Sequence, residues 1–236
     1  MRTNLFYSLF LFILASCSNS SDAFLNKGKE MMQKGAFKEA LPYLNTAINK
    51  NTDNAQAFNV RGVAHYNLQN FSEAILDFNR AIEINAFNYQ PYYNRALAKT
   101  SLGNTEGALE DYNKAIEIKA DTHDLYINRG QIFYELKQTD KALEDFNKAI
   151  SMYAKDKNAF YNRGNIYFQQ QNFDLAVKDF QEAIKLDPKF AKAHYGLGLA
   201  QAYLGKNEEA CLHLLKAQQA DYPDAKAALE KYCKKN

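Results

Sequence analysis

The sequence predicts an all-helical protein that is built from six copies of one 34-residue repeat and closed by a further helix. Three observations lead to this class. The 236 residues are 47% apolar and 24% charged, so the chain can build a packed core. Its 10 glycines and 4 prolines are too few for a turn-rich β protein. Alanine, glycine and aromatic residues recur every 34 positions from residue 21 to residue 224.

Composition and motifs exclude several functions. The chain has 29 Lys and Arg against 27 Asp and Glu, a net charge of +2, and no block of like charges. Nucleic-acid-binding domains carry clustered basic residues, so no nucleic-acid partner is expected. The four histidines are scattered, and the sequence has no HExxH motif, paired-cysteine motif or glycine-rich phosphate loop. We therefore expect no enzyme activity, no catalytic residue, no metal site and no cofactor.

The first element, residues 1–16, is predicted to be an export signal. Arg2 precedes an eleven-residue apolar run at 5–15, shorter than the roughly 20 residues that span a bilayer. The run ends in Leu-Ala-Ser-Cys at 14–17, which resembles the lipobox of bacterial lipoproteins. The resemblance implies cleavage before Cys17 and lipid attachment to its thiol. The alternative is an ordinary secretory signal in which this cysteine is a bystander.

An acylated Cys17 would hold the protein on a membrane without a spanning helix. Each buried methylene contributes about 0.8 kcal/mol, and several acyl chains together give stable anchoring. In the lipoprotein family the uncharged Ser18 that follows indicates the outer membrane, with the inner membrane as the alternative. We expect a lipid-anchored protein of the cell envelope that faces the periplasm. The tether of five residues, 18–22, reaches at most roughly 17 Å, so the expected partners are membrane-proximal envelope proteins.

Three columns of small residues define the repeat. Where two helices cross, small side chains let the backbones approach, while large side chains fill the space between neighbouring repeats. The two alanine columns are Ala40, Ala74, Ala108, Ala142, Ala176 and Ala210, and Ala47, Ala81, Ala115, Ala149, Ala183 and Ala217. The third column is Gly28, Gly62, Ala96, Gly130, Gly164 and Gly198. A column of large residues is Leu44, Phe78, Tyr112, Phe146, Phe180 and Leu214.

This pattern resembles the tetratricopeptide repeat family, and residues 157–190 carry nearly all of it, with Pro188 near the end. The resemblance implies that each repeat is a pair of antiparallel helices and that the repeats stack into a solenoid. Leu229 and Tyr232 lie on one side of the last segment, which is therefore expected to be a capping helix. The predicted segments are a lipidated tether at 17–21, repeats at 21–54, 55–88, 89–122, 123–156, 157–190 and 191–224, and a cap at 225–236.

Cys211 and Cys233 are predicted to form a disulfide. Residues at equal distance from the turn of a helix pair lie at equal height, and the midpoint of these cysteines is Tyr222, inside a turn that contains Pro223. The bond would close a loop of 22 residues and contribute about 3 kcal/mol in the chain-entropy model. Two free buried thiols are the alternative.

Four repeats carry an arginine that is followed sixteen residues later by an aspartate, and the first and last repeats lack both. Because the arginine and the aspartate are present or absent together, we predict that each arginine pairs with the aspartate of its own repeat. Pairing with the preceding repeat's aspartate would leave Arg61 and Asp179 unmatched. A basic stripe for an acidic ligand is the functional alternative. The pairs are Arg61 with Asp77, Arg95 with Asp111, Arg129 with Asp145 and Arg163 with Asp179.

The family resemblance implies that the first helices of successive repeats line a concave groove. Asparagine amides can bridge the donor and acceptor of a peptide backbone, and tyrosine offers apolar area with a polar tip. The predicted groove residues are Asn94, Asn128, Asn162, Tyr66, Tyr93, Tyr134, Tyr161 and Phe168. They suit an extended peptide, and a helix is the alternative ligand. A purely structural role for the asparagines is the alternative function.

The sequence as a whole predicts a non-catalytic scaffold or adaptor, lipid-anchored in the bacterial envelope, that binds peptide segments of a partner protein. Three alternatives stay open: an assembly factor like the pilotin lipoproteins, an adaptor for a cell-wall hydrolase, and a non-catalytic subunit of an envelope enzyme complex. The sequence does not fix the oligomeric state.

Overall fold

The computed structural model describes residues 20–233, and the predicted all-helical class is confirmed there. Thirteen helices follow one another in consecutive helix–turn–helix pairs, with no strand in this range. The predicted export signal and Cys17 lie outside the described residues, as do residues 234–236. None of the helices in the described range has the length and apolar character that crossing a membrane requires. The chain divides into two compact units, Met1–Ala120 and Asp121–Asn236.

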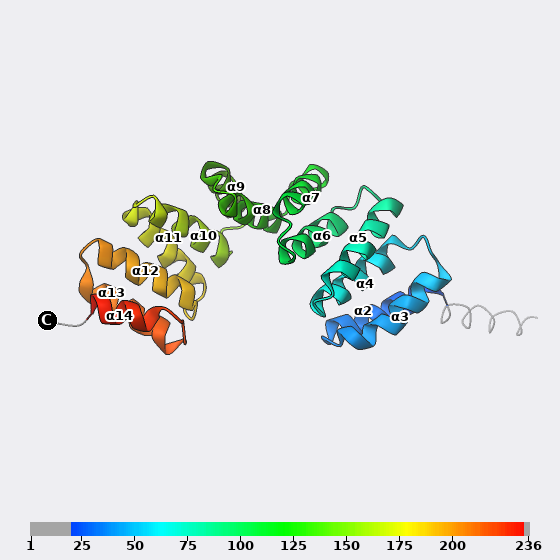
Figure 1. Ribbon diagram of the computed structural model, residues 1–236, viewed down its shortest axis with the longest axis horizontal. Helices are drawn as coiled ribbons and strands as arrows, with labels where there is room; N and C mark the ends of the chain where they lie inside the picture. Colours follow the sequence, from blue (N-terminus) through cyan, green and yellow to red (C-terminus); the bar gives the residue numbers. More distant parts are fainter. Residues whose placement is uncertain (1–19, 234–236) are drawn as a thin grey trace, which may run out of the picture. The chain divides into compact units, whose positions relative to one another are not determined.

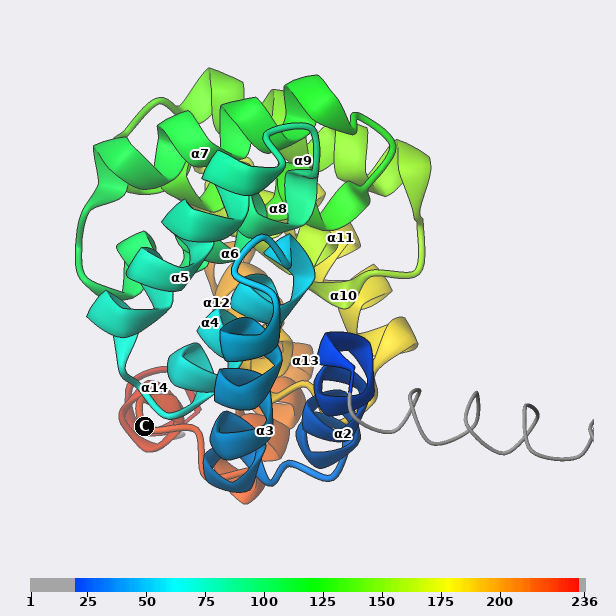
Figure 2. The ribbon, with the colours of Figure 1, turned by 90° about the vertical axis from the view of Figure 1, so that its right-hand side faces the viewer.

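The N-terminal unit contains six described helices, two from each of the first three predicted repeats. The helices of a repeat pack on each other, and the second helix of one repeat packs on the first helix of the next, as α3 does on α4. Figure 2 shows α2, α3 and α4 side by side. The helices are α2 (Ser21–Gln33), α3 (Phe37–Lys50), α4 (Ala55–Asn67), α5 (Phe71–Ile84), α6 (Tyr89–Ser101) and α7 (Thr105–Ile118), labelled in Figure 1.

The C-terminal unit contains three further pairs and the cap. Its helices are α8 (His123–Glu135), α9 (Thr139–Met152), α10 (Lys157–Gln169), α11 (Phe173–Leu186), α12 (Ala191–Tyr203), α13 (Asn207–Gln219) and α14 (Ala225–Tyr232). The helix α14 packs against α13 and α12, which is the position expected of a cap. The described part of the predicted capping segment is thus helical from Ala225 to Tyr232.

Local polar groups set several helix ends. The Ser20 side chain accepts a hydrogen bond from the backbone nitrogen of Ala23, at 3.1 Å, and thereby caps α2. Asn54 caps α4 in the same way through the nitrogen of Ala57, at 3.0 Å. The turn after α2 contains Gly35 with a φ of 71°, a left-handed conformation that glycine adopts without strain.

The small-residue columns lie where helices meet. All twelve alanines of the two columns are 0% exposed. Gly62 shows why its column must stay small, because a Cβ atom there would lie 2.5 Å from the ring of Phe78. That ring is itself 0% exposed. Close helix contact therefore depends on the smallest side chains, as the repeat pattern predicts.

A disulfide links the cap to the last repeat. The Sγ atoms of Cys211 in α13 and Cys233 after α14 lie 2.09 Å apart, and their Cα atoms 5.6 Å apart. The separation of 22 residues places both cysteines at one end of the helix pair formed by α13 and α14. The bond therefore restrains α14 against the body of the C-terminal unit.

Candidate functional site

Each predicted arginine is placed against the aspartate of its own repeat. The guanidinium Nε and Nη2 donate to both carboxylate oxygens at 2.6–2.8 Å. The aspartate side chains are only 4–6% exposed. The hydrogen bond to Asp179 raises the pKa of Arg163. Because these donors are engaged inside the repeat, the geometry favours a structural role over a basic stripe for a ligand.

A third side chain joins three of these pairs. The guanidinium Nη1 of Arg61 donates to Asn45 of the preceding repeat at 2.8 Å. Each network therefore ties two neighbouring repeats together. Sequence reasoning missed the asparagines, although each stands sixteen residues before its arginine. The other two networks are Asn79 with Arg95, at 2.6 Å, and Asn147 with Arg163, at 2.7 Å.

The first and last repeats, which lack the ion pair, fill the two positions differently. In the first repeat the Lys27 ammonium lies 6.0 Å from the centroid of the Tyr43 ring. In the last repeat Leu197 is 1% exposed at the arginine position, and His213 takes the aspartate position. Both repeats therefore fill the arginine and aspartate positions without a buried carboxylate.

His194 and His213 form a packed pair. Their Nδ1 atoms are 2.9 Å apart, and Nε2 of His194 lies 3.1 Å from the carbonyl oxygen of Pro188. A carbonyl only accepts, so neutral His194 carries its proton on Nε2 and accepts from His213 through Nδ1. Burial, followed by the charge of His194, lowers the pKa of His213 to about 4. His213 is therefore neutral near neutral pH, and the ring contacts give the pair a structural role.

One cluster in residues 20–233 has the residue types of a metal site. His123, Asp124 and Asp156 bring one potential ligand atom each within 4.8 Å of one another. The Asp156 carboxylate already caps α10 by accepting from the backbone nitrogens of Asn158 and Ala159. Helix capping therefore explains this carboxylate, and no metal is assigned to the cluster.

Inside each unit the first helices of successive repeats contact one another and form what we call the first-helix face. It consists of α2, α4 and α6 in the N-terminal unit, and of α8, α10, α12 and α14 in the C-terminal unit. All eight predicted groove residues belong to these helices.

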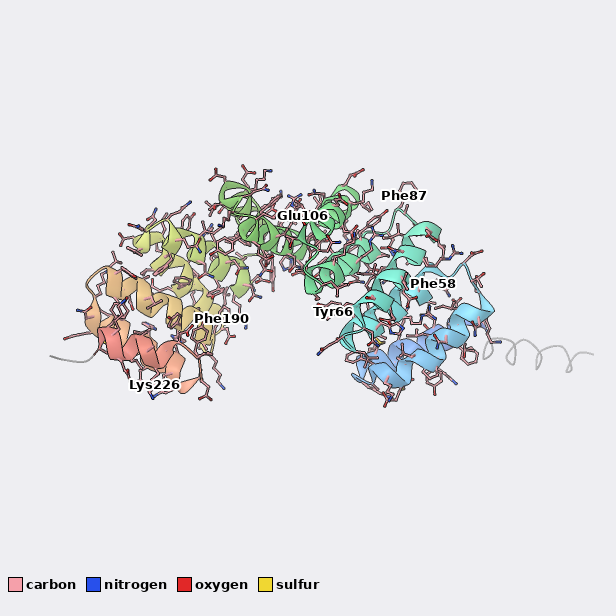
Figure 3. The ribbon with its side chains drawn as sticks, in the orientation of Figure 1. Phe58, Tyr66, Phe87, Glu106, Phe190 and Lys226 are labelled. Carbon is pink, nitrogen blue, oxygen red and sulfur yellow. A yellow bond between two sulfur atoms is a disulfide. The ribbon has the colours of Figure 1, made fainter. Side chains whose placement is uncertain are left out.

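In the N-terminal unit the predicted groove residues are half-buried and partly engaged. The side-chain nitrogen of Asn94 donates to Asn59 at 3.0 Å, so this amide already has a protein partner. The Tyr66 ring projects near the end of α4 and lies 5.4 Å from the ring of Phe71 (Figure 3). Tyr93 lies 6.2 Å from Tyr112. A pocket of about 280 Å³ on this face, not predicted from the sequence, is lined by Lys29, Met32, Gln33, Val60 and Val63.

In the C-terminal unit the predicted tyrosines belong to larger contacts. The Tyr134 hydroxyl accepts a hydrogen bond from Gln169, and burial raises the pKa of Tyr134. The Tyr161 ring lies 5.9 Å from Phe180 and 5.2 Å from Phe190. Asn128 and Asn162 are half-buried on α8 and α10. The Asn162 side-chain nitrogen is buried without a hydrogen-bond partner among the described residues.

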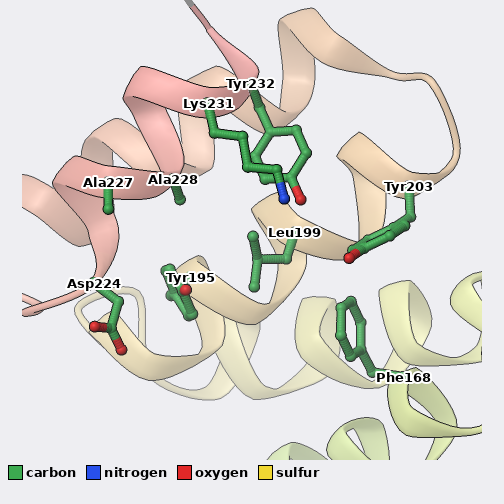
Figure 4. A pocket seen from close by; sticks show the side chains of 9 residues that line it. All are labelled: Phe168, Tyr195, Leu199, Tyr203, Asp224, Ala227, Ala228, Lys231 and Tyr232. Carbon is green, nitrogen blue, oxygen red and sulfur yellow. The ribbon is translucent and has the colours of Figure 1, made fainter.

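The last predicted groove residue, Phe168, opens onto a second pocket. Its ring lies 5.6 Å from Tyr203, and the pocket has a volume of about 350 Å³. Sequence reasoning missed most of this pocket, because α14 lies outside the 34-residue period. Phe168, Tyr195, Leu199, Tyr203, Asp224, Ala227, Ala228, Lys231 and Tyr232 line it (Figure 4).

Comparison with family models identifies the repeat. The model described as "TPR repeat" matches residues 97–137, 130–171 and 164–205. The model described as "Tetratricopeptide repeat" matches residues 55–88. Together these matches span well over half of the chain. No curated protein matches the sequence.

Solved structures show the same fold at low sequence identity. YrrB, described as a TPR protein with an unusual peptide-binding site, is 22% identical with a TM-score of 0.65 over 79% of this chain and 97% of its own. A tetratricopeptide repeat protein from Parabacteroides merdae is 22% identical with a TM-score of 0.69, over 92% and 94%. The pilF protein of Pseudomonas aeruginosa is 14% identical with a TM-score of 0.79, over 88% and 97%. At these identities the likeness shows the fold alone.

Proposed function

Because this chain belongs to the tetratricopeptide repeat family, we propose that it is a non-catalytic scaffold that binds peptide segments of an envelope partner on its first-helix face. The fold itself indicates a protein-interaction scaffold. The observation that carries the finer proposal is that both units have a pocket on this face, one of about 280 Å³ and one of about 350 Å³. YrrB, which shares the fold, has a peptide-binding site.

The chemistry of the two pockets suits peptides. Methionine and valine side chains line the first, and aromatic rings line the second. Tyrosine and phenylalanine provide large contact areas at low entropic cost, and tyrosine hydroxyls add hydrogen bonds to a backbone. The four buried aspartates are each paired with an arginine of their own repeat. The face is therefore better suited to recognition than to chemistry.

Site-specific crosslinking in intact cells tests this function. A photoreactive phenylalanine analogue in place of Tyr203, on the first-helix face, is expected to crosslink a defined segment of one envelope protein, identified by mass spectrometry. The matched control is Leu212 on α13, because it is 53% exposed and Tyr203 is 56% exposed. Equal crosslinking from both positions, or none from Tyr203, would contradict the proposal. The partner also separates the alternatives, because a secretin would indicate a pilotin-like factor and a wall hydrolase an adaptor.

We also propose that the mature protein is anchored by lipid on Cys17 and faces the periplasm at the outer membrane. The lipobox-like residues 14–17 support this location. The Cys211–Cys233 pair adds support, because disulfides persist in oxidising compartments such as the periplasm.

Replacing Cys17 with alanine is expected to release the protein from the membrane fraction and to abolish uptake of labelled palmitate. The reason is that acyl chains on this thiol would be its only attachment in the proposal. Fractionation and autoradiography measure both effects. The control is Cys211→Ser/Cys233→Ser, which should stay on the membrane and keep its label. If Cys17→Ala remains membrane-bound and takes up as much palmitate as the natural protein, the anchor proposal is wrong.

A further inference from the structure

The pocket at the end of the C-terminal unit has opposite charges at its two ends. Leu199 of α12, Ala228 of α14 and Phe168 of α10 provide apolar lining (Figure 4). Asp224 precedes the first residue of α14, and Lys231 lies in its last turn. A helix rises 1.5 Å per residue, so these two backbone positions are about 10 Å apart along α14. The pocket is therefore an apolar cleft between an anion and a cation.

The cationic end carries the exposed ammonium of Lys231. This ammonium lies 4.9 Å from the centroid of the Tyr232 ring, and that ring lies 6.3 Å from the ring of Tyr203. Figure 4 shows the Lys231 ammonium beside the Tyr232 hydroxyl. A carboxylate that enters this end of the pocket therefore meets a cation flanked by two tyrosines.

The anionic end is similarly available. The Asp224 carboxylate makes no capping hydrogen bond to α14. Within residues 20–233 neither Asp224 nor Lys231 takes part in an ion pair, and both residues are exposed. Asp224 and Tyr195 line the same part of the pocket (Figure 4). Asp224 is the N-cap residue of α14 and Lys231 lies within this helix, so the helix fixes the spacing of their backbones, and the disulfide of Cys233 restrains it against α13.

We propose that this pocket binds an extended partner segment with the pattern basic–x–apolar–x–acidic, read in either direction along the chain. The basic side chain faces Asp224, and the apolar one, preferably aromatic, lies over Leu199 beside Phe168. The acidic side chain accepts from the ammonium of Lys231. This inference rests on the proposed function, because it names the peptide that the first-helix face would take.

The spacing follows from strand geometry. Alternate side chains of an extended segment project to one side, so residues i, i+2 and i+4 can all face the pocket. Residues i and i+4 are about 13 Å apart. Their side chains can cover the small difference from the roughly 10 Å between the backbone positions of Asp224 and Lys231. Burial of the apolar side chain supplies most of the affinity. The charged ends select segments whose two outer side chains have opposite charges, because a segment with two like charges would bring one of them against its own sign.

Selection of peptides from a random library tests the proposal. A displayed library of random nine-residue peptides is selected on the purified natural protein and, in parallel, on the variants Asp224→Lys and Lys231→Asp. The natural protein is expected to enrich segments with an apolar residue at i+2 and opposite charges at i and i+4. Asp224→Lys, with two cationic ends, is expected to enrich acidic–x–apolar–x–acidic, and Lys231→Asp, with two anionic ends, is expected to enrich basic–x–apolar–x–basic. A synthetic peptide of the natural pattern should bind the natural protein at least ten-fold more tightly than a counterpart with two like charges.

Controls separate the outcomes. Lys226→Asp changes a charge on α14 outside the pocket lining, and it should leave the selected pattern unchanged (Figure 3). The neutral variants Asp224→Asn and Lys231→Gln serve if a charge-reversed variant fails to fold, and each should lose the charge preference at one end of the selected pattern only. If the enriched peptides ignore these charges, the inference is wrong and the proposed function stands. If no peptide is enriched on any of the proteins, the proposed function fails with it.

Discussion

Replacing Phe78 with alanine is expected to lower the free energy of unfolding by about 3–5 kcal/mol, the usual cost of truncating a buried aromatic side chain. The ring is 0% exposed and lies against the backbone of Gly62, where a Cβ would come within 2.5 Å of it. Its removal leaves a cavity where the two helices of the repeat cross, and the other contacts between these helices prevent them from closing it. Urea denaturation followed by circular dichroism measures the loss.

The chain supplies the control for this prediction. Leucine stands at the equivalent position of the first and last repeats, as Leu44 and Leu214, and both are 0% exposed. Phe78→Leu is therefore expected to cost less than about 1.5 kcal/mol, because the repeat already accepts that shape. If Phe78→Ala and Phe78→Leu cost the same, the ring does not hold the helices together, and the packing argument for the repeat is wrong.

The sequence predicted the fold well because the repeat imposes the same steric requirement six times. A buried helix crossing such as that at Gly62 and Phe78 admits few side chains, so the restriction is visible as a column. The ion pairs were visible for the same reason, since arginine and aspartate appear and disappear together. The asparagines that join them are equally periodic, but a polar residue on a helix has many explanations, and only the contact of Asn45 with Arg61 selects one.

The candidate site was harder to predict because binding surfaces are not repeated. The cap contributes Asp224, Lys231 and Tyr232 to the pocket, and these residues lie outside the period. The surroundings of Tyr232 also depend on Tyr203, which belongs to another helix and whose ring lies 6.3 Å away. The spacing of residues in the sequence shows neither which cap residues line the pocket nor that Tyr203 lies near Tyr232. Asn94 illustrates the opposite error, because its amide is engaged by Asn59 and is less available to a ligand than its column suggests.

Replacing Arg163 with leucine is expected to destabilise the protein by about 3 kcal/mol, because it leaves the carboxylate of Asp179 buried without its partner. That carboxylate is 6% exposed and receives two hydrogen bonds from the guanidinium, at 2.7 and 2.8 Å. The control is Lys185→Ala on α11, the helix that carries Asp179. This substitution removes a solvent-exposed ion pair with Glu182. Its cost is expected to stay below about 1 kcal/mol. Thermal unfolding of both variants measures the difference.

The second variant, Arg163→Leu/Asp179→Leu, determines what the ion pairs contribute. The last repeat already has an apolar solution, with Leu197 at the arginine position and 1% exposed. Replacing both charges removes the uncompensated carboxylate, so the double variant is expected to recover at least half of the stability lost by Arg163→Leu. Recovery would mean that the pairs specify how repeats join, through contacts such as Arg163 with Asn147, more than they add stability. A double variant that is less stable than Arg163→Leu would show instead that the ion pairs themselves are a main source of stability in the stack.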